Sequence, residues 1–135
     1  MTKIIYSNSD GTVSVVTPTG SIDDAKKAVP YGISYGIVED NKIPTDRTFR
    51  NAWVKGSNVV TEDVTKSKVI AHSTRREKRE VEFKPHDDII AKQIPGKSAS
   101  DAETARAAIR TKYATMQTNI DNATDIAGIK TALGD

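Results

Sequence analysis

The spacing of apolar residues changes near the middle of the chain. In the first half they form short runs rich in Val and Ile, and in the second half they recur at intervals of three and four residues. Runs of the first kind are typical of β-strands, and the second spacing is typical of amphipathic helices. The pattern predicts an α+β chain: a small N-terminal β module of hairpins and one short helix, followed by a helical C-terminal half.

Two β-branched runs, at residues 3–7 and 12–17, open the chain and are separated by the letters NSDG. Asn, Asp and Gly adopt the backbone conformations that tight turns require, so the two runs predict a β-hairpin. A short helix is expected over residues 22–29 because Ser21 can cap its first turn, acidic residues follow the cap, and Pro30 ends it.

A third strand is expected at about residues 33–39. Alternation along this strand would place Ile33, Tyr35 and Ile37 on one face. Farther along, the letters TDRTFRNAW predict a tight helical turn, and AWVKGSNVVTED predicts a second small hairpin around KGSN. We therefore assign residues 1–62 to one small α+β module.

The next segment, residues 63–97, is predicted to be a basic helix and a connector. A long helix over 63–83 is expected to stop near Pro85, because proline lacks the N–H that a helix interior needs. A short second helix is then expected over residues 86–94, ended by a Pro-Gly pair.

The last segment, residues 98–135, is predicted to be a helical hairpin that serves in oligomerisation. Ser100 is the expected N-cap of a helix that runs to about residue 121, since Glu103 follows it at the spacing of a capping box. Thr124 is the expected cap of a short final helix. The apolar positions of the long helix are Ala102, Ala105, Ile109, Tyr113, Met116, Ile120 and Ala123, and those of the final helix are Ile126, Ile129 and Leu133.

The apolar positions of the long helix form a narrow stripe close to a heptad seam. A stripe of this width suits packing between helices better than docking on a large core. We expect it to pack within the chain or in a homo-oligomer, and contact with another protein is the alternative. The side chains that would carry such an interface are Ile109, Tyr113, Met116 and Ile120.

Composition narrows the function classes. The chain has 135 residues, about one domain's worth, and its charged fraction of 28% is high beside a hydrophobic fraction of 36%. It contains no Cys, which excludes disulfides, thiolate catalysis and Cys-based zinc sites. Its net charge of +2 is too small to indicate nucleic-acid binding by itself. No run approaches the ~20 apolar residues that span a bilayer, so no membrane partner is expected.

Four basic residues, Arg75, Arg76, Lys78 and Arg79, lie within five positions. One interpretation is a helix face that binds phosphates, with affinity that depends on salt. The other is a solvated or protein-contacting helix, stabilised by pairs one turn apart such as Arg76 with Glu80 and Lys78 with Glu82. We favour the second, because no aromatic residues interleave the cluster.

Candidate chemistry is sparse. The letters PHDD place His86 beside Asp87 and Asp88, but adjacent residues of a helix point in different directions, and the two acids suit the start of a helix. His72 stands alone within a predicted helix. We expect no catalytic residues, no metal site and no cofactor, and therefore no enzyme.

The densest stretch is IPTDRTFRNAWV. Phe49 and Trp53 are four residues apart, so a helical turn would place both on one face, flanked by Arg47 and Arg50. One interpretation is a structural staple, in which the rings are buried against the sheet. The alternative is an exposed protein-binding anchor, because Trp and Arg are favoured at interface hot spots.

This stretch also carries a resemblance. The segments IIYSNSDGTVSVVTP, VPYGISYGIVED and IPTDRTFRNAWV resemble a group of small tailed-bacteriophage proteins whose signature is Asp-Arg-x-Phe-Arg-x-Ala-Trp. The segment ETARAAIRTKYATMQTNIDNATDIAGIKTAL is similar to the helical C-terminal tails of phage tail-fibre assembly and other tail-associated proteins. In this chain the signature falls on Asp46, Arg47, Phe49, Arg50, Ala52 and Trp53.

The resemblance implies a non-enzymatic virion or assembly component, associated with a tail or tail fibre, that acts through protein–protein contacts. Other phage structural proteins would be its partners, and it would be found in the virion or in the host cytoplasm during assembly. The predicted helix at residues 63–83 is more basic than expected for such a protein. The alternative is therefore a small nucleic-acid-binding or regulatory protein that uses the cluster at residues 75–79.

Overall fold

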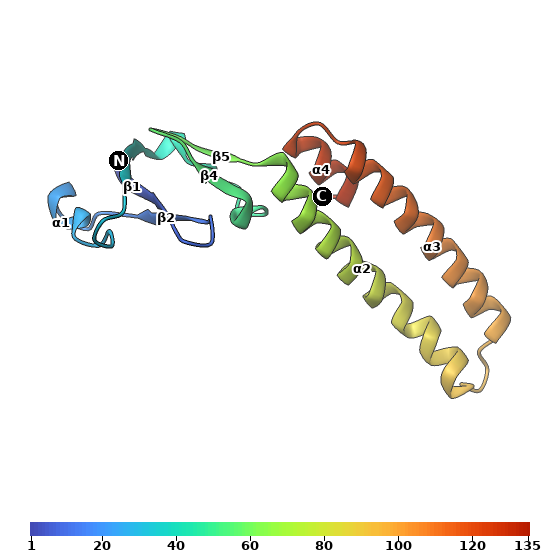
Figure 1. Cartoon of the computed structure of the whole chain (residues 1–135). Helices are drawn as coiled ribbons and strands as arrows, with labels where there is room; N and C mark the ends of the chain where they lie inside the picture. Colours follow the sequence, from blue (N-terminus) through green and yellow to red (C-terminus); the bar gives the residue numbers. More distant parts are fainter. The chain divides into compact units, whose positions relative to one another are not determined.

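The computed structural model describes residues 1–135 and confirms an α+β chain. Strands in small antiparallel sheets are followed by a helical C-terminal half (Figure 1). The chain divides into two compact units, Met1–Ser67 and Lys68–Asp135, and the division falls within the first long helix. None of the helices is both long and apolar enough to cross a membrane.

The first sheet has three strands: β1 (Thr2–Ser7), β2 (Val13–Val16) and β3 (Tyr35–Glu39). Their order is β2-β1-β3, and both pairings are antiparallel, so the central strand is the first in the sequence. The predicted hairpin of β1 and β2 is confirmed. Its turn contains Gly11 at a φ of 84°, a conformation that favours glycine.

Helix α1 (Ile22–Lys26) has the predicted cap, since the Ser21 side chain accepts a hydrogen bond from the N–H of Asp24. It is shorter than the predicted 22–29, because the N–H groups of Ala28 and Val29 bond to the third preceding carbonyl and form tighter turns. Strand β3 likewise begins two residues later than predicted. The reason is that the N–H of Ile33 closes a turn onto the carbonyl of Pro30.

Two 3-10 turns, η1 (Asp40–Lys42) and η2 (Arg50–Ala52), precede the second hairpin, which consists of β4 (Trp53–Lys55) and β5 (Val60–Glu62). The helical turn of the TDRTFRNAW stretch is thus a short 3-10 turn, and the predicted hairpin around KGSN is confirmed. The core of this unit is a cluster of Ile5, Val13, Val38, Trp53 and Val60, with Val15 and Ile43 packed against it.

Helix α2 (Val64–Lys92) is continuous through Pro85, so the predicted break after residue 83 is wrong. Proline at this position leaves the carbonyl of Val81 without its helical partner. The Val81 side chain is 72% exposed and Pro85 is exposed as well, so this carbonyl lies on a side of the helix that water reaches. One missing hydrogen bond does not end this helix, because its 29 residues form many others.

Helix α3 (Ala99–Asn122) and helix α4 (Ile126–Leu133) complete the chain. Both begin at a cap other than the predicted one. Ser98, not Ser100, accepts from the N–H of Asp101, and Asp125, not Thr124, accepts from the N–H of Gly128. The cap of α3 is thus two residues before the predicted one, and the cap of α4 is one residue after it. In both helices a neighbouring polar side chain makes the bond instead.

Candidate functional site

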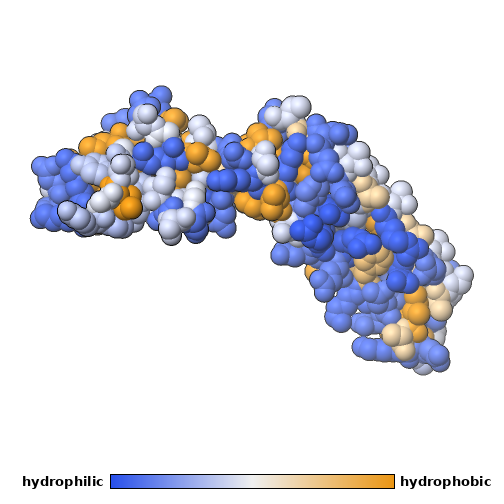
Figure 2. All heavy atoms as spheres, in the orientation of Figure 1, coloured by the Kyte–Doolittle hydropathy of each residue, from blue (hydrophilic) through white to orange (hydrophobic).

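Strand β3 and the segment just before it present a row of large apolar side chains to solvent. Tyr35 and Ile37 are each 43% exposed, Ile33 is 41% exposed, and Tyr31 is fully exposed. Figure 2 shows hydrophobic patches among hydrophilic residues on the viewed face of the N-terminal unit. The alternating residue Val38 is buried in the core, so the strand has one inner and one outer face.

The same strand has an unpaired edge. Sheet order places β3 beside β1 only. The N–H of Asp40 donates to the carbonyl of Met1, so these two residues form a hydrogen-bonded pair. Such pairs alternate along an antiparallel ladder, so the even-numbered residues of β3 are the ones that bond to β1. The backbone N–H and C=O groups of Tyr35, Ile37 and Glu39 therefore point away from the sheet. In Tyr35 and Ile37, an exposed apolar side chain and outward-facing backbone groups belong to the same residue.

The predicted strand face is confirmed for Tyr35 and Ile37, which lie on one side of the sheet. Sequence reasoning did not recognise that this side is exposed. Helix α1 contacts the central strand, where Ile4 is fully buried, but it leaves Ile37 on the next strand partly uncovered. The length of the SIDDAKKAV helix could have predicted this exposure, because one short helix cannot cover a whole face of a three-stranded sheet.

The cation Lys26 of α1 lies close to this row. Its ammonium bonds to Asp23 at 2.9 Å. That hydrogen bond, with the nearby charges of Asp23 and Tyr35, raises the pKa of Lys26. The exposed apolar row is thus bordered by a positive charge beside Tyr35 and by the carboxylate of Glu39 at the end of the strand.

The TDRTFRNAW stretch is organised around buried rings. Phe49 and Trp53 are 1% exposed, so neither ring is available as an exposed anchor in this structure. The Arg50 guanidinium stacks 4.2 Å from the centre of the Trp53 ring and donates to the carbonyl of Val13 on β2. Burial, with the like charge of Arg47, lowers the pKa of Arg50. These contacts match the staple interpretation, in which this turn ties the second hairpin to the sheet.

A polar pocket of about 390 Å³ lies beside the staple. Its charged walls are Lys3, Arg47, Arg50 and Asp40, and Trp53 forms part of its lining. Lys3 pairs with Asp40 at 3.1 Å, and this bond lowers the pKa of that carboxyl.

The four basic residues of the predicted cluster do not share one free surface. Arg75 is buried, and its Nε donates to His72 at 3.3 Å. Burial, followed by the charges of Arg76 and Arg79, lowers the pKa of Arg75. Arg79 stacks 4.9 Å from the ring centre of Phe83, and Arg76 donates to Ser73. Arg75 is thus used within the fold, whereas Arg76 and Arg79 are exposed and contact only residues of their own helix.

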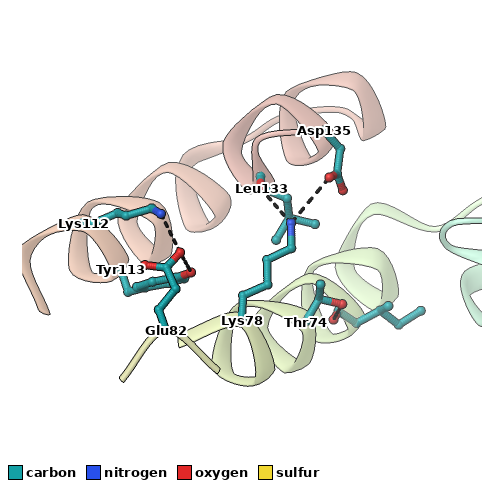
Figure 3. Close-up of polar contacts among 8 residues, drawn as sticks. Thr74, Lys78, Glu82, Lys112, Tyr113, Leu133 and Asp135 are labelled. Atoms are coloured by element: carbon teal, nitrogen blue, oxygen red, sulfur yellow. Dashed lines mark hydrogen bonds and ion pairs between the residues drawn. The ribbon is translucent and has the colours of Figure 1, made fainter. Parts of the chain in front are cut away.

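Lys78 is engaged in the same way, as Figure 3 shows. Its ammonium donates to the carbonyl of Leu133 at 3.1 Å and lies 3.4 Å from Asp135. The predicted Lys78–Glu82 pair is wrong, because Glu82 instead accepts from Lys112 and Tyr113 on α3. Contacts from α3 and α4 thus replace pairs along one helix.

The apolar stripe of α3 is largely consumed inside one copy of the chain. Ile109, Tyr113 and Ile120 are buried, and Met116 is half-buried. Helix α4 packs against α3 and buries Ile129 and Leu133. Packing within the chain was one of the two expectations for this stripe, and it leaves little of the stripe for a second copy.

No group of three or more potential metal ligands lies together. In the PHDD segment, Asp87 pairs with Arg106 at 2.8 Å, and Asp88 lies between Lys84 and Lys92. The carboxylates of this segment are therefore engaged in ion pairs along and between the helices.

Comparison with models of protein families, with curated proteins and with solved structures finds no match to this chain.

Proposed function

We propose that this protein is a non-enzymatic structural or assembly component of a tailed bacteriophage, associated with the tail or tail fibre, that acts by protein–protein contact. The observation that carries the proposal is the exposed row of Ile33, Tyr35 and Ile37 at an unpaired strand edge. Large apolar side chains beside free backbone groups form a surface that binds an extended segment by strand addition.

The resemblance of the Asp-Arg-x-Phe-Arg-x-Ala-Trp segment supports the phage setting of this proposal. In the structure, Phe49, Arg50 and Trp53 of that segment hold the second hairpin against the sheet that ends in β3. On this proposal the signature residues stabilise the fold of the module, and the surface that contacts the partner lies on β3. Other phage structural proteins are the proposed partners, in the virion or in the host cytoplasm during assembly.

The test is to purify tails, tail fibres and assembly intermediates from cells infected with the phage that carries this gene, and to measure the protein in each by mass spectrometry. Ile37→Lys should abolish the association, because it places a charge in the contact surface. Val81→Lys is the matched control, since Val81 is exposed on α2 of the other unit. Absence of the wild-type protein from every fraction, with normal tail assembly when the gene is deleted, would overturn the proposal.

A further inference from the structure

We infer that β3 pairs antiparallel with β3 of a second copy of this chain, about a two-fold axis at Ile37, so that two three-stranded sheets become one continuous sheet. The inference rests on the proposed function, because it names the first partner of the same contact surface. It differs from the expectation that the α3 stripe holds copies together.

Backbone geometry permits this pairing. The outward-facing residues of β3 are Tyr35, Ile37 and Glu39. With the axis at Ile37, each outward residue meets another outward residue: Ile37 faces its own counterpart, and Tyr35 faces Glu39 of the second copy. Facing pairs of this kind exchange both backbone hydrogen bonds, so the free N–H and C=O groups of the edge are satisfied together.

The neighbouring register, with the axis at Gly36, is poorer. It would pair Tyr35 with Ile37 of the second copy and would leave Glu39 opposite Ile33. The N–H of Ile33 is already donated to the carbonyl of Pro30. This register therefore loses the outer facing pairs that the axis at Ile37 provides.

Side chains favour the same register. Cross-strand neighbours lie on one face of a sheet, so the pairing places two Ile37 side chains in contact and removes apolar surface from water. It also brings Glu39 of the second copy toward Lys26, which lies near Tyr35. Within one copy, Lys26 pairs with Asp23 at 2.9 Å and Glu39 lies 3.7 Å from the amino group of Met1, so the new contact would join two exposed ion pairs of opposite polarity. Since the axis makes this contact twice, the surface is complementary in charge to itself. This complementarity selects a second copy over an unrelated strand.

The sequence makes a direct test simple because the chain contains no Cys. In the proposed dimer, a Cys at position 37 faces its counterpart across a hydrogen-bonded pair, where the Cα atoms lie about 5.5 Å apart and a disulfide is allowed. Ile33→Cys is the matched control, because Ile33 has nearly the same exposure but no counterpart across the axis.

We expect light scattering to find a dimer of the wild-type chain and a monomer of Ile37→Lys, with circular dichroism unchanged. Under mild oxidation, Ile37→Cys should become a covalent dimer at least tenfold faster than Ile33→Cys, on the order expected for a pre-assembled pair over random collision. A wild-type monomer over a wide concentration range, or equal cross-linking of the two variants, would overturn the inference. A dimer that survives Ile37→Lys would also overturn it, by assigning the interface to another surface.

The two proposals fail separately. If the chain is a monomer but still associates with phage tail components in a manner that depends on Ile37, the β3 surface binds another protein and only the self-pairing is wrong. If the chain is a dimer through Ile37 yet is found with no tail component, self-pairing stands and the proposed function fails.

Discussion

The hydroxyl of Tyr113 on α3 donates a hydrogen bond to Oε1 of Glu82 on α2, with an oxygen–oxygen distance of 2.6 Å (Figure 3). Lys112 donates to the same carboxylate oxygen at 2.6 Å. The two helices of the hairpin are thus joined by a carboxylate that accepts from one neutral and one charged donor. The ring of Tyr113 is buried, so the bond lies at the edge of the apolar stripe.

Tyr113→Phe removes this hydrogen bond and keeps the ring. We expect the free energy of unfolding to fall by about 1–2 kcal/mol, the range for a hydrogen bond to a charged group that keeps a second partner. Urea denaturation measures the change. Tyr31→Phe is the control, because Tyr31 is fully exposed and should change stability by less than about 0.5 kcal/mol. Equal stability of the two variants would contradict a structural role for the bond.

The same contact predicts a dependence on alkaline pH. Burial, with the adjacent Glu82, raises the pKa of Tyr113 from 10.0 to about 12. A folded-state pKa above the unfolded value contributes stability that is fully present below pH 10 and is lost as pH rises through about 12. The difference in melting temperature between wild type and Tyr113→Phe should therefore shrink between these values. A difference that stays constant from pH 9 to 12 would show that the phenol is not protected in the folded chain.

Local signals in the sequence predicted the order and type of most elements, including the hairpins and the cap at Ser21. These signals gave wrong predictions where contacts between residues distant in the sequence determine the structure. Pro85 was expected to end a helix, yet the surrounding helix continues, and Lys78 bonds to α4 instead of to Glu82. The α3 stripe could be recognised as an interface, but its spacing is the same whether the partner is α4 or a second copy. Exposure of Ile37 likewise depends on how much of the sheet α1 covers.

Gly36 is needed where the second hairpin meets the sheet. A Cβ atom at this position would lie 2.6 Å from the carbonyl oxygen of Ser57, a backbone atom that cannot turn aside. We expect Gly36→Ala to destabilise the chain by about 1–3 kcal/mol, the range for overpacking. Gly20→Ala is the control, since a Cβ there meets nothing within 4 Å. Thermal unfolding of the two variants side by side would decide, and a Gly36→Ala variant as stable as its control would rule out this close approach.

Arg50 is expected to matter more than Arg47, although both belong to the TDRTFRNAW stretch. Arg50 stacks 4.2 Å from the centre of the Trp53 ring and bonds to the Val13 carbonyl, whereas Arg47 is exposed and lies 5.7 Å from the same ring. Arg50→Met should lower the free energy of unfolding by about 1–3 kcal/mol. Arg47→Met removes the same charge and should cost less than about 0.5 kcal/mol. Urea denaturation measures both changes. A larger loss of stability in Arg47→Met than in Arg50→Met would contradict the role given to Arg50.

Pro85 lies inside α2, so its replacement should stabilise the chain. Pro85→Ala restores the N–H that bonds to the carbonyl of Val81 and removes the clash of the ring with the preceding turn. We expect the free energy of unfolding to rise by about 1–3 kcal/mol, close to the helix-propensity difference between the two residues. Lys84→Ala, one residue earlier, is the control and should change it by less than about 0.5 kcal/mol. Unchanged or lower stability of Pro85→Ala would contradict this prediction.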